Sequence, residues 1–127
     1  PEVFISPDRT FANNGLDSVS SVLDFTDFGL GKFTRNTDDN GRFKIPTLRN
    51  LAFSAPYMHD GRFATLDEVI DFYNDGPKGS PTLEPIMREK ANKRVELTGH
   101  WGLSLSAQDK ADLKAFLLSL SDSSFVQ

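Results

Sequence analysis

The sequence predicts an all-α fold of short helices joined by long loops. Two segments, 65–76 and 106–120, each begin with a capping residue and continue with apolar residues at helical spacing. Residues 1–42 are instead rich in Pro, Asn, Asp, Gly and Ser, and their apolar residues keep no period of 2 or 3.6. We therefore expect three to five short helices, mainly after residue 42, and loops anchored by single aromatic side chains before it.

Two turns are expected within this first, loop-rich segment. The runs at 13–15 (Asn-Asn-Gly) and 39–41 (Asp-Asn-Gly) are turn signals, because glycine and asparagine tolerate positive φ. Residues 18–23 carry a weak pattern for one helical turn. The first helix is then expected at Thr47–Phe53, with Pro46 as a favourable first residue and Pro56 beyond its end.

The helix at 65–76 has a strong local start signal. Thr65 and Glu68 form a capping box, in which each side chain satisfies a free backbone N–H of the other residue. Apolar residues follow at i, i+3, i+4 and i+7, so this helix is expected to bury one stripe. The residues of the stripe are Leu66, Val69, Ile70 and Tyr73.

Residues 77–104 are expected to form a long connection, because prolines and a glycine interrupt their first part. Within it, residues 86–92 have a possible helical turn, and the charged middle is expected to face solvent. The last helix is capped by Ser106 and runs from Ala107 to about Leu120. Its apolar face contains Leu113, Phe116, Leu117 and Leu120.

Composition narrows the function classes. The 127 residues have the length of one domain, and 11 phenylalanines supply much of the burial, which suits a core wrapped around a flat group. The net charge of −4 and the absence of a long basic run argue against nucleic acid as a partner. No apolar stretch approaches the roughly 20 residues that span a bilayer. Without cysteine, the chain has no disulfide, thiolate nucleophile or cysteine-ligated metal.

The run Tyr57-Met58-His59-Asp60-Gly61 concentrates candidate iron ligands. Methionine and histidine are common axial ligands of haem iron, and tyrosine serves in some proteins. The alternative interpretation is structural, with Met58 filling a gap in the core and His59 hydrogen-bonding a loop.

Tyr73 and Arg49 are the next candidates for cofactor binding. Tyr73 lies on the buried stripe of its helix, where a phenol needs a hydrogen-bond or metal partner. Arg49 precedes the candidate run closely enough to bind a cofactor carboxylate, although a surface salt bridge is the alternative. Other catalytic patterns are missing, including G-x-S-x-G, H-E-x-x-H, an EF-hand loop and a phosphate-binding glycine loop. We therefore assign no catalytic residue.

The same residues closely resemble the C-terminal haem domain of the bacterial di-haem cytochrome c peroxidases, a superfamily that includes the methylamine dehydrogenase maturation enzymes. The resemblance extends from about Phe4 to Leu120, and its motifs occur in the same order as in the family. The matching runs are Phe-Ala-Asn-Asn-Gly-Leu at 11–16, Phe-Lys-Ile-Pro-Thr-Leu-Arg-Asn at 43–50, Ala-Pro-Tyr-Met-His-Asp-Gly-Arg-Phe at 55–63, Asp-Phe-Tyr-Asn at 71–74 and the final helix from residue 105.

The resemblance implies a cytochrome c-like domain and assigns roles to the candidate residues. In family peroxidases a methionine ligates the C-terminal haem at the position of Tyr73, whereas the maturation relatives have a tyrosine there. Tyr73 is thus the preferred axial ligand and Met58 the rival. Arg49 corresponds to an arginine at the haem propionates and His59 to a histidine near the haem edge. The family also binds calcium through backbone carbonyls at the positions of Ser54 and Pro56.

The chain departs from the family in having no C-x-x-C-H motif, so it cannot attach haem c by itself. We therefore expect a truncated domain: a fragment of a periplasmic di-haem protein that lacks its N-terminal haem domain. That parent would reduce hydrogen peroxide or oxidise a partner, with a small redox protein as electron donor, while this chain alone would be inactive. Exposed apolar surface is expected to favour self-association. The alternative function is a haem-free binding module that retains the cytochrome scaffold.

Overall fold

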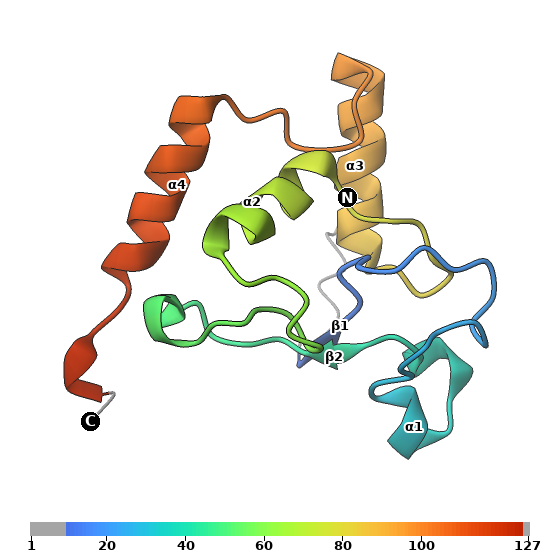
Figure 1. Ribbon diagram of the computed structural model, residues 1–127. Helices are drawn as coiled ribbons and strands as arrows, with labels where there is room; N and C mark the ends of the chain where they lie inside the picture. Colours follow the sequence, from blue (N-terminus) through green and yellow to red (C-terminus); the bar gives the residue numbers. More distant parts are fainter. Residues whose placement is uncertain (1–9, 126–127) are drawn as a thin grey trace. The chain divides into compact units, whose positions relative to one another are not determined.

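A computed structural model describes residues 10–125 of the chain (Figure 1). The regular elements are β1 Phe11–Ala12, α1 Gly31–Thr34, β2 Phe43–Lys44, α2 Leu66–Asp75, α3 Pro85–Thr98 and α4 Ala107–Ser119, with 3₁₀ turns at Thr37–Asp39, Leu51–Phe53 and Ser123–Phe125. The expectation of short helices with long loops is confirmed for this part of the chain. Phe4, where the family resemblance begins, lies outside the described residues.

The chain separates into two compact units. The first unit comprises residues 10–46 and 77–92, and the second comprises 47–76 and 93–125. The first unit contains the antiparallel pair β1–β2, with Phe11 opposite Lys44 and Ala12 opposite Phe43. This two-residue ladder was not predicted, because two residues are too few to show an alternating pattern. The predicted turns are present, with Gly15 and Gly41 at φ +73° and +78°.

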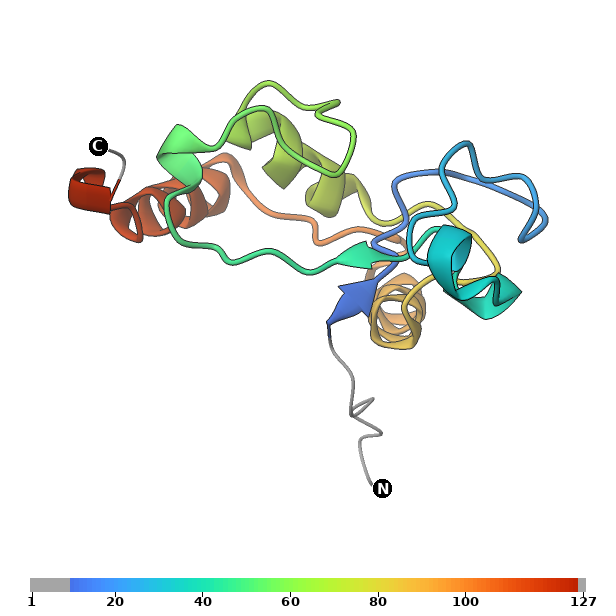
Figure 2. The same ribbon diagram turned by 90° about the horizontal axis from the view of Figure 1, so that it is seen from below.

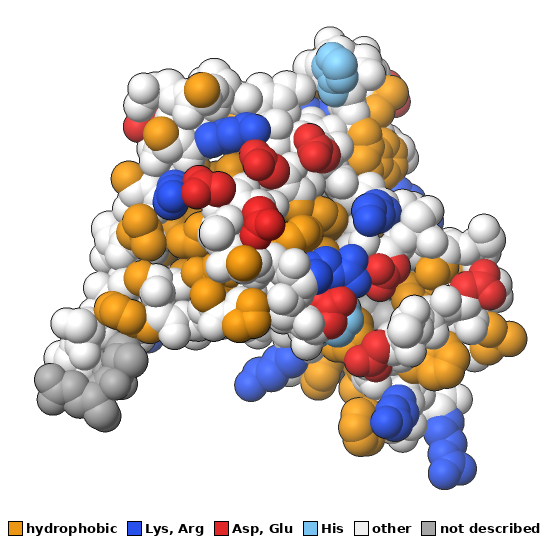
Figure 3. Space-filling model, viewed as in Figure 1, with side chains coloured by type: hydrophobic (Ala, Val, Ile, Leu, Met, Phe, Trp, Pro, Cys, Tyr) orange, Lys and Arg blue, Asp and Glu red, His pale blue; other side chains and the backbone are white. Residues whose placement is uncertain are grey.

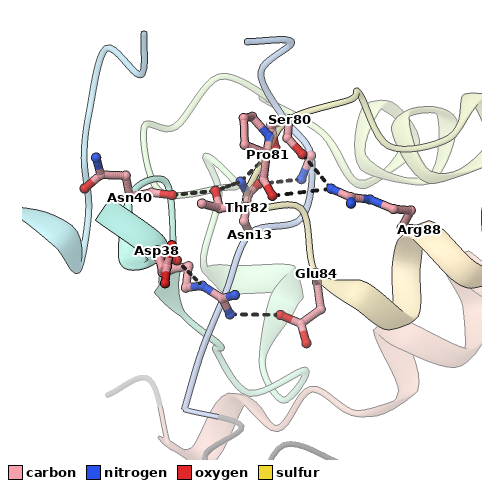
Figure 4. Close-up of polar contacts among 10 residues, drawn as sticks. Asn13, Asp38, Asn40, Ser80, Pro81, Thr82, Glu84 and Arg88 are labelled. Atoms are coloured by element: carbon pink, nitrogen blue, oxygen red, sulfur yellow. Dashed lines mark hydrogen bonds and ion pairs between the residues drawn. The ribbon is translucent and has the colours of Figure 1, made fainter. Parts of the chain in front are cut away.

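A buried polar network stabilises the first unit (Figure 4). Asn13 donates from Nδ2 to Ser80 Oγ and Thr82 Oγ1, both at 3.0 Å, and its Oδ1 accepts the N–H of Gly15 at 2.9 Å. Thr82 in turn donates to the carbonyl of Asn40 at 2.6 Å. The polar groups of these side chains are hydrogen-bonded to one another. The network therefore joins the N-terminal loops to residues 77–84 and leaves none of the groups just named buried without a partner.

One local expectation for the first unit is wrong, and one short helix was missed. Residues 18–23 form bends and a turn rather than helix, whereas the missed one-turn helix α1 follows at Gly31–Thr34. The start of α1 carries no side-chain cap, and Arg35 ends it in the left-handed region at φ +56°. Gly31 packs so closely on Asn40 that a Cβ there would overlap its amide oxygen. Tertiary packing therefore places this turn, and local sequence signals do not.

The helix expected at Thr47–Phe53 is also wrong in extent. Only Leu51–Phe53 is helical, as one 3₁₀ turn, and Asn50 before it is in the left-handed region at φ +61°. The backbone N–H of Asn50 donates to the carbonyl of Leu120 at 3.2 Å, and Asn50 Oδ1 accepts the N–H of Asp122 at 2.7 Å. Contacts with the end of α4 thus hold Asn50 in a conformation that a continuous helix excludes.

Helix α2 confirms its predicted start. Thr65 Oγ1 accepts the N–H of Glu68 at 3.3 Å, and Glu68 Oε2 accepts the N–H of Thr65 at 2.9 Å, which completes the capping box. Leu66 and Ile70 are buried as expected, while Tyr73 is only half-buried. Phe72, which the expected stripe omitted, is buried as well. Gly76 ends the helix at φ +100°.

We expect Thr65→Ala to lower the free energy of unfolding by about 1 kcal/mol, because the variant loses the cap that bonds the Glu68 N–H. Urea unfolding followed by circular dichroism measures the change. Thr26→Ala is the matched control, since Thr26 is exposed and lies outside any helix. Equal stability of Thr65→Ala and Thr26→Ala would contradict a stabilising role for the cap.

Helix α3 corrects the expectation that residues 77–104 form a long connection. It spans 14 residues, although only a turn at 86–92 was expected. Its residues are mostly exposed and only Ala91 is buried, so the expectation of a solvated middle is confirmed. The helix lacks an apolar stripe because Met, Arg, Glu, Lys and Ala dominate it, and these residues favour helix by propensity alone.

Helix α4 begins at the predicted cap, where Ser106 and Asp109 form a second capping box. In the second unit it lies beside α2 (Figures 1 and 2), and two ion pairs join the helices. Lys110 pairs with Asp71 at 2.8 Å and Lys114 with Asp67 at 2.7 Å. The side chains of Lys110 and Lys114 therefore point toward α2.

No residue of α4 is fully buried, so its apolar side chains remain accessible. Leu113, Phe116 and Leu120 are 36%, 58% and 36% exposed, and Figure 3 shows hydrophobic side chains gathered over this helix. Phe53 of the neighbouring 3₁₀ turn is 50% exposed. The predicted exposed apolar surface is thus confirmed within the second unit.

Candidate functional site

The loop that carries Met58 and His59 is a tight reversal within the second unit. Tyr57 and Phe63 form an isolated antiparallel bridge, in which the Tyr57 N–H donates to the Phe63 carbonyl at 2.8 Å. Between them, Met58 and Gly61 have positive φ values of +72° and +68°. Gly61 allows the sharp turn, and Met58 has a backbone conformation that non-glycine residues rarely adopt.

Tyr57 fastens this loop to the 3₁₀ turn that precedes it. Its phenol donates to the carbonyl of Leu51 at 2.6 Å. Met58 is half-buried beside this anchor, and His59 is exposed at the tip. The loop therefore presents a thioether and an imidazole on a short backbone segment with fixed ends.

An ion pair stiffens the tip of the loop. Arg62 donates from its guanidinium to Asp60 at 2.7 Å, and its N–H donates to Asp60 Oδ1 at 3.2 Å. The hydrogen bond from the Arg62 side chain is the main cause that holds the pKa of the Asp60 carboxyl below its usual range.

The stabilisation from this ion pair is expected to be present at neutral pH and to disappear as pH falls through the native pKa of Asp60, because a lowered pKa favours the charged native form. In the Arg62→Gln variant the pKa of Asp60 is expected to rise toward its ordinary value. Carboxyl carbon NMR titration measures this pKa. Lys93→Gln, which changes an exposed charge on α3, is the control. An unchanged Asp60 pKa in Arg62→Gln would contradict the assignment.

Tyr73 lies in the last turn of α2 and joins an aromatic cluster with the loop. The Phe72 ring contacts the Tyr73 ring edge-on with centroids 5.0 Å apart, and Phe63 follows at 5.8 Å from Phe72. Phe63 closes the loop that bears Met58, so the cluster joins Tyr73 to the end of that loop. The structure thereby connects two of the predicted site segments.

The remaining predicted residues are exposed. Arg49 lies in a turn in which its N–H donates to Thr47 Oγ1 at 3.2 Å. Ser54 and Pro56 flank the start of the loop, and Ser54 donates from Oγ to the Leu51 carbonyl at 3.4 Å. Contact of Arg49 with a propionate and of the Ser54 and Pro56 carbonyls with calcium remain predictions.

The structure adds a hollow that sequence reasoning missed. It has a volume of about 280 Å³ and lies at the C-terminal end of α2. Its lining consists of Asn74, Asp75, His100, Trp101, Gly102 and Ser104. No local sequence signal predicts it, because contacts between residues about 30 positions apart form it. Within residues 10–125 no cluster of three or more His, Asp or Glu side chains suited to a metal ion is found.

The chemistry of the side chains fits one face of a haem. A half-buried phenol, a half-buried thioether and an exposed imidazole are available as iron ligands or edge contacts, and an accessible apolar surface lies in the same unit. Covalent attachment of haem c needs cysteines, and the 127 residues contain none. The side chains are thus of types that can bind a haem, but the 127 residues cannot attach one covalently through cysteine.

Comparison with known proteins places this arrangement in context. The chain is 35% identical over 127 residues to the cytochrome-c peroxidase IdrP2 of Denitromonas iodatirespirans, a match that covers 95% of this chain and 29% of the relative. It is 34% identical over 96 residues to the methylamine utilization protein MauG of Methylorubrum extorquens, covering 74% of this chain and 24% of the relative. A search with protein-family models gave no match.

A solved structure shares the fold. The crystal structure of a MauG-like protein associated with microbial copper homeostasis matches 96% of this chain and 38% of that chain, with a TM-score of 0.74 and 36% identity. These matches define the class of protein: a domain of short helices and loops that is related to cytochrome c peroxidases and MauG proteins. Within that class, the chain belongs to the bacterial di-haem cytochrome c peroxidase and MauG superfamily. It spans less than a third of the length of its peroxidase relatives.

Proposed function

We propose that the chain acts as the C-terminal electron-transfer domain of a periplasmic, di-haem peroxidase-like oxidoreductase. The observation that carries this proposal is the similarity to a cytochrome-c peroxidase over 95% of the chain. The parent protein would reduce hydrogen peroxide or oxidise a partner. The 127 residues cover only 29% of that relative and contain no cysteine, so the proposal requires a haem-attachment motif in a segment outside them.

In this proposal Tyr73 is the distal axial ligand of the haem iron. A bound haem would supply the reversible one-electron chemistry, and its ligand would tune the potential. Tyrosinate is a hard anion that stabilises ferric iron, so the Tyr73 phenol must give up its proton on coordination. Helix α2 supports this role, because its capping box and its buried Leu66, Ile70 and Phe72 fix the backbone that bears Tyr73. Met58 is the rival ligand.

The surrounding residues have supporting roles in the proposal. His59 lies near the haem edge, and Arg49 binds a haem propionate through its guanidinium. The backbone carbonyls of Ser54 and Pro56 contribute to a calcium site, since calcium prefers oxygen ligands. The partners are the other haem domain of the parent and a small redox protein that donates electrons, with self-association as a further contact of the apolar surface.

A haem-free binding module is the second candidate function. The absence of cysteine from all 127 residues favours it, as does the exposed apolar surface over α4. In this case the cytochrome scaffold would serve only for contact with a partner. Among residues 10–125 no helix is long and apolar enough to cross a membrane.

The haem content of the protein made from the complete reading frame distinguishes the two functions. Expression in a host that matures c-type cytochromes, followed by alkaline pyridine haemochrome spectra and intact mass, is expected to show two covalently bound haems for each chain. The 127-residue chain serves as the control and is expected to bind none covalently. A complete protein without covalent haem would reject the electron-transfer proposal and favour the binding module.

A further inference from the structure

Asn74, the residue after Tyr73, fastens the end of α2 to the loop before α4. Its side-chain Oδ1 accepts the backbone N–H of Leu105 at 2.6 Å, and its backbone carbonyl accepts the N–H of Leu103 at 2.9 Å. The side-chain bond is partly buried. One residue therefore accepts two hydrogen bonds from a segment about 30 positions further along the chain.

Two glycines allow this close approach. A Cβ on Gly102 would overlap the carbonyl oxygen of Asn74, and a Cβ on Gly76 would overlap the ring of Trp101. Gly76 also has a φ of +100°, which side-chain-bearing residues rarely adopt. The helix end and the loop thus fit together without room for larger residues.

The contact matters because it is made in the last turn of a helix. The final four carbonyls of an α-helix have no partner within the helix, and this turn frays unless other groups supply donors. Here the Gly76 N–H donates to the Phe72 carbonyl at 3.0 Å and the Leu103 N–H donates to the Asn74 carbonyl. Tyr73 lies between these two carbonyls, so the turn that carries its side chain is held on both sides.

We propose that Asn74 is a positioning residue for Tyr73: by locking the last turn of α2 to residues 103–105, it holds the phenol in place for iron coordination. The inference rests on the proposed function, since it takes Tyr73 as the ligand. A metal–oxygen bond requires a defined position of the phenol oxygen, and a frayed turn would spread that oxygen over many positions.

Hydrogen exchange in the 127-residue chain, without haem, tests whether the Asn74 side chain stabilises the contact between the end of α2 and residues 103–105. In Asn74→Ala, peptides covering 66–76 and 103–106 are expected to exchange about 5- to 10-fold faster, the factor that corresponds to loss of one hydrogen bond. Asn74→Asp keeps an acceptor oxygen and is expected to retain most of the protection. Asn92→Ala, which changes an exposed residue of α3, is the matched control. Equal exchange rates in Asn74→Ala and Asn92→Ala would show that the Asn74 side chain does not stabilise this contact.

The ferric spectrum of the complete haem-loaded protein then tests positioning. Asn74→Ala is expected to weaken the tyrosinate charge-transfer band several-fold and to shift its appearance toward higher pH, because poor positioning disfavours coordination coupled to deprotonation. Asn74→Asp is expected to restore the band. A band with normal intensity and pH profile in Asn74→Ala, despite faster exchange, overturns the inference and leaves Asn74 a structural residue. If Tyr73→Phe leaves the spectrum unchanged, Tyr73 is not the ligand, and the proposed ligation fails together with this inference.

Discussion

Replacing Asn13 by alanine is expected to destabilise the unit formed by residues 10–46 and 77–92 by about 2–4 kcal/mol. Asn13 is 4% exposed and is at the centre of the polar network in Figure 4. Truncation removes two donated hydrogen bonds and leaves the Gly15 N–H without its acceptor in a buried position. Each buried group left unpaired costs about 1–3 kcal/mol, which sets the expected range.

Urea unfolding measures this loss of stability, provided that the signal followed comes from residues 10–46 and 77–92. Trp101, Tyr57 and Tyr73 belong to the other unit, so hydrogen exchange of peptides from residues 10–25 and 77–84 is followed as denaturant rises, with Trp101 fluorescence as the internal comparison. Thr82→Val, which removes the bond to the Asn40 carbonyl, is expected to affect the same peptides. The exposed Asn92→Ala is the control. If these peptides become exposed at the same urea concentration in Asn13→Ala and in Asn92→Ala, the network does not stabilise the unit.

The helices that sequence predicts well are those whose starts are encoded locally. Thr65 with Glu68, and Ser106 with Asp109, each place the cap and its partner three residues apart, so a few positions suffice to recognise them. Gly76 likewise marks the end of α2 through a conformation that only glycine adopts easily. Such signals depend on no distant contact and are therefore readable from the chain.

The errors arise where distant contacts or propensity alone decide the structure. Asn50 is held at positive φ by Leu120 and Asp122, about 70 positions away, so the local pattern at 47–53 predicts a longer helix than the chain forms. Helix α3 has good helix formers without an apolar stripe, and periodicity therefore gives no sign of it. The pair β1–β2 is too short to be recognised.

The candidate site likewise contains residues that local motifs predict and a contact that they do not. The run at 57–61 and Tyr73 were predicted from a local motif and from helical spacing. The aromatic cluster of Phe63, Phe72 and Tyr73 joins α2 to the end of the loop that contains this run. The lock between Asn74 and Leu105 was missed, because it joins residues 31 positions apart through a backbone N–H. Any backbone can supply that donor, so residue identity gives no warning of it.

Tyr73→Phe in the complete, haem-loaded protein is expected to change the ferric haem more than any other single substitution in this chain. The variant keeps the ring and its edge-on contact with Phe72, and it removes only the oxygen that would bind iron. Because nothing else in the aromatic cluster changes, a spectral difference can be assigned to ligation. Met58→Leu is the matched substitution at the rival ligand, since it preserves side-chain volume while removing the sulfur.

The ferric absorption spectra of these two variants show whether Tyr73 or Met58 binds the haem iron. We expect Tyr73→Phe to lose the tyrosinate charge-transfer band completely, while Met58→Leu retains the wild-type spectrum. A band that survives in Tyr73→Phe, or one that disappears in Met58→Leu alone, would contradict Tyr73 as the axial ligand.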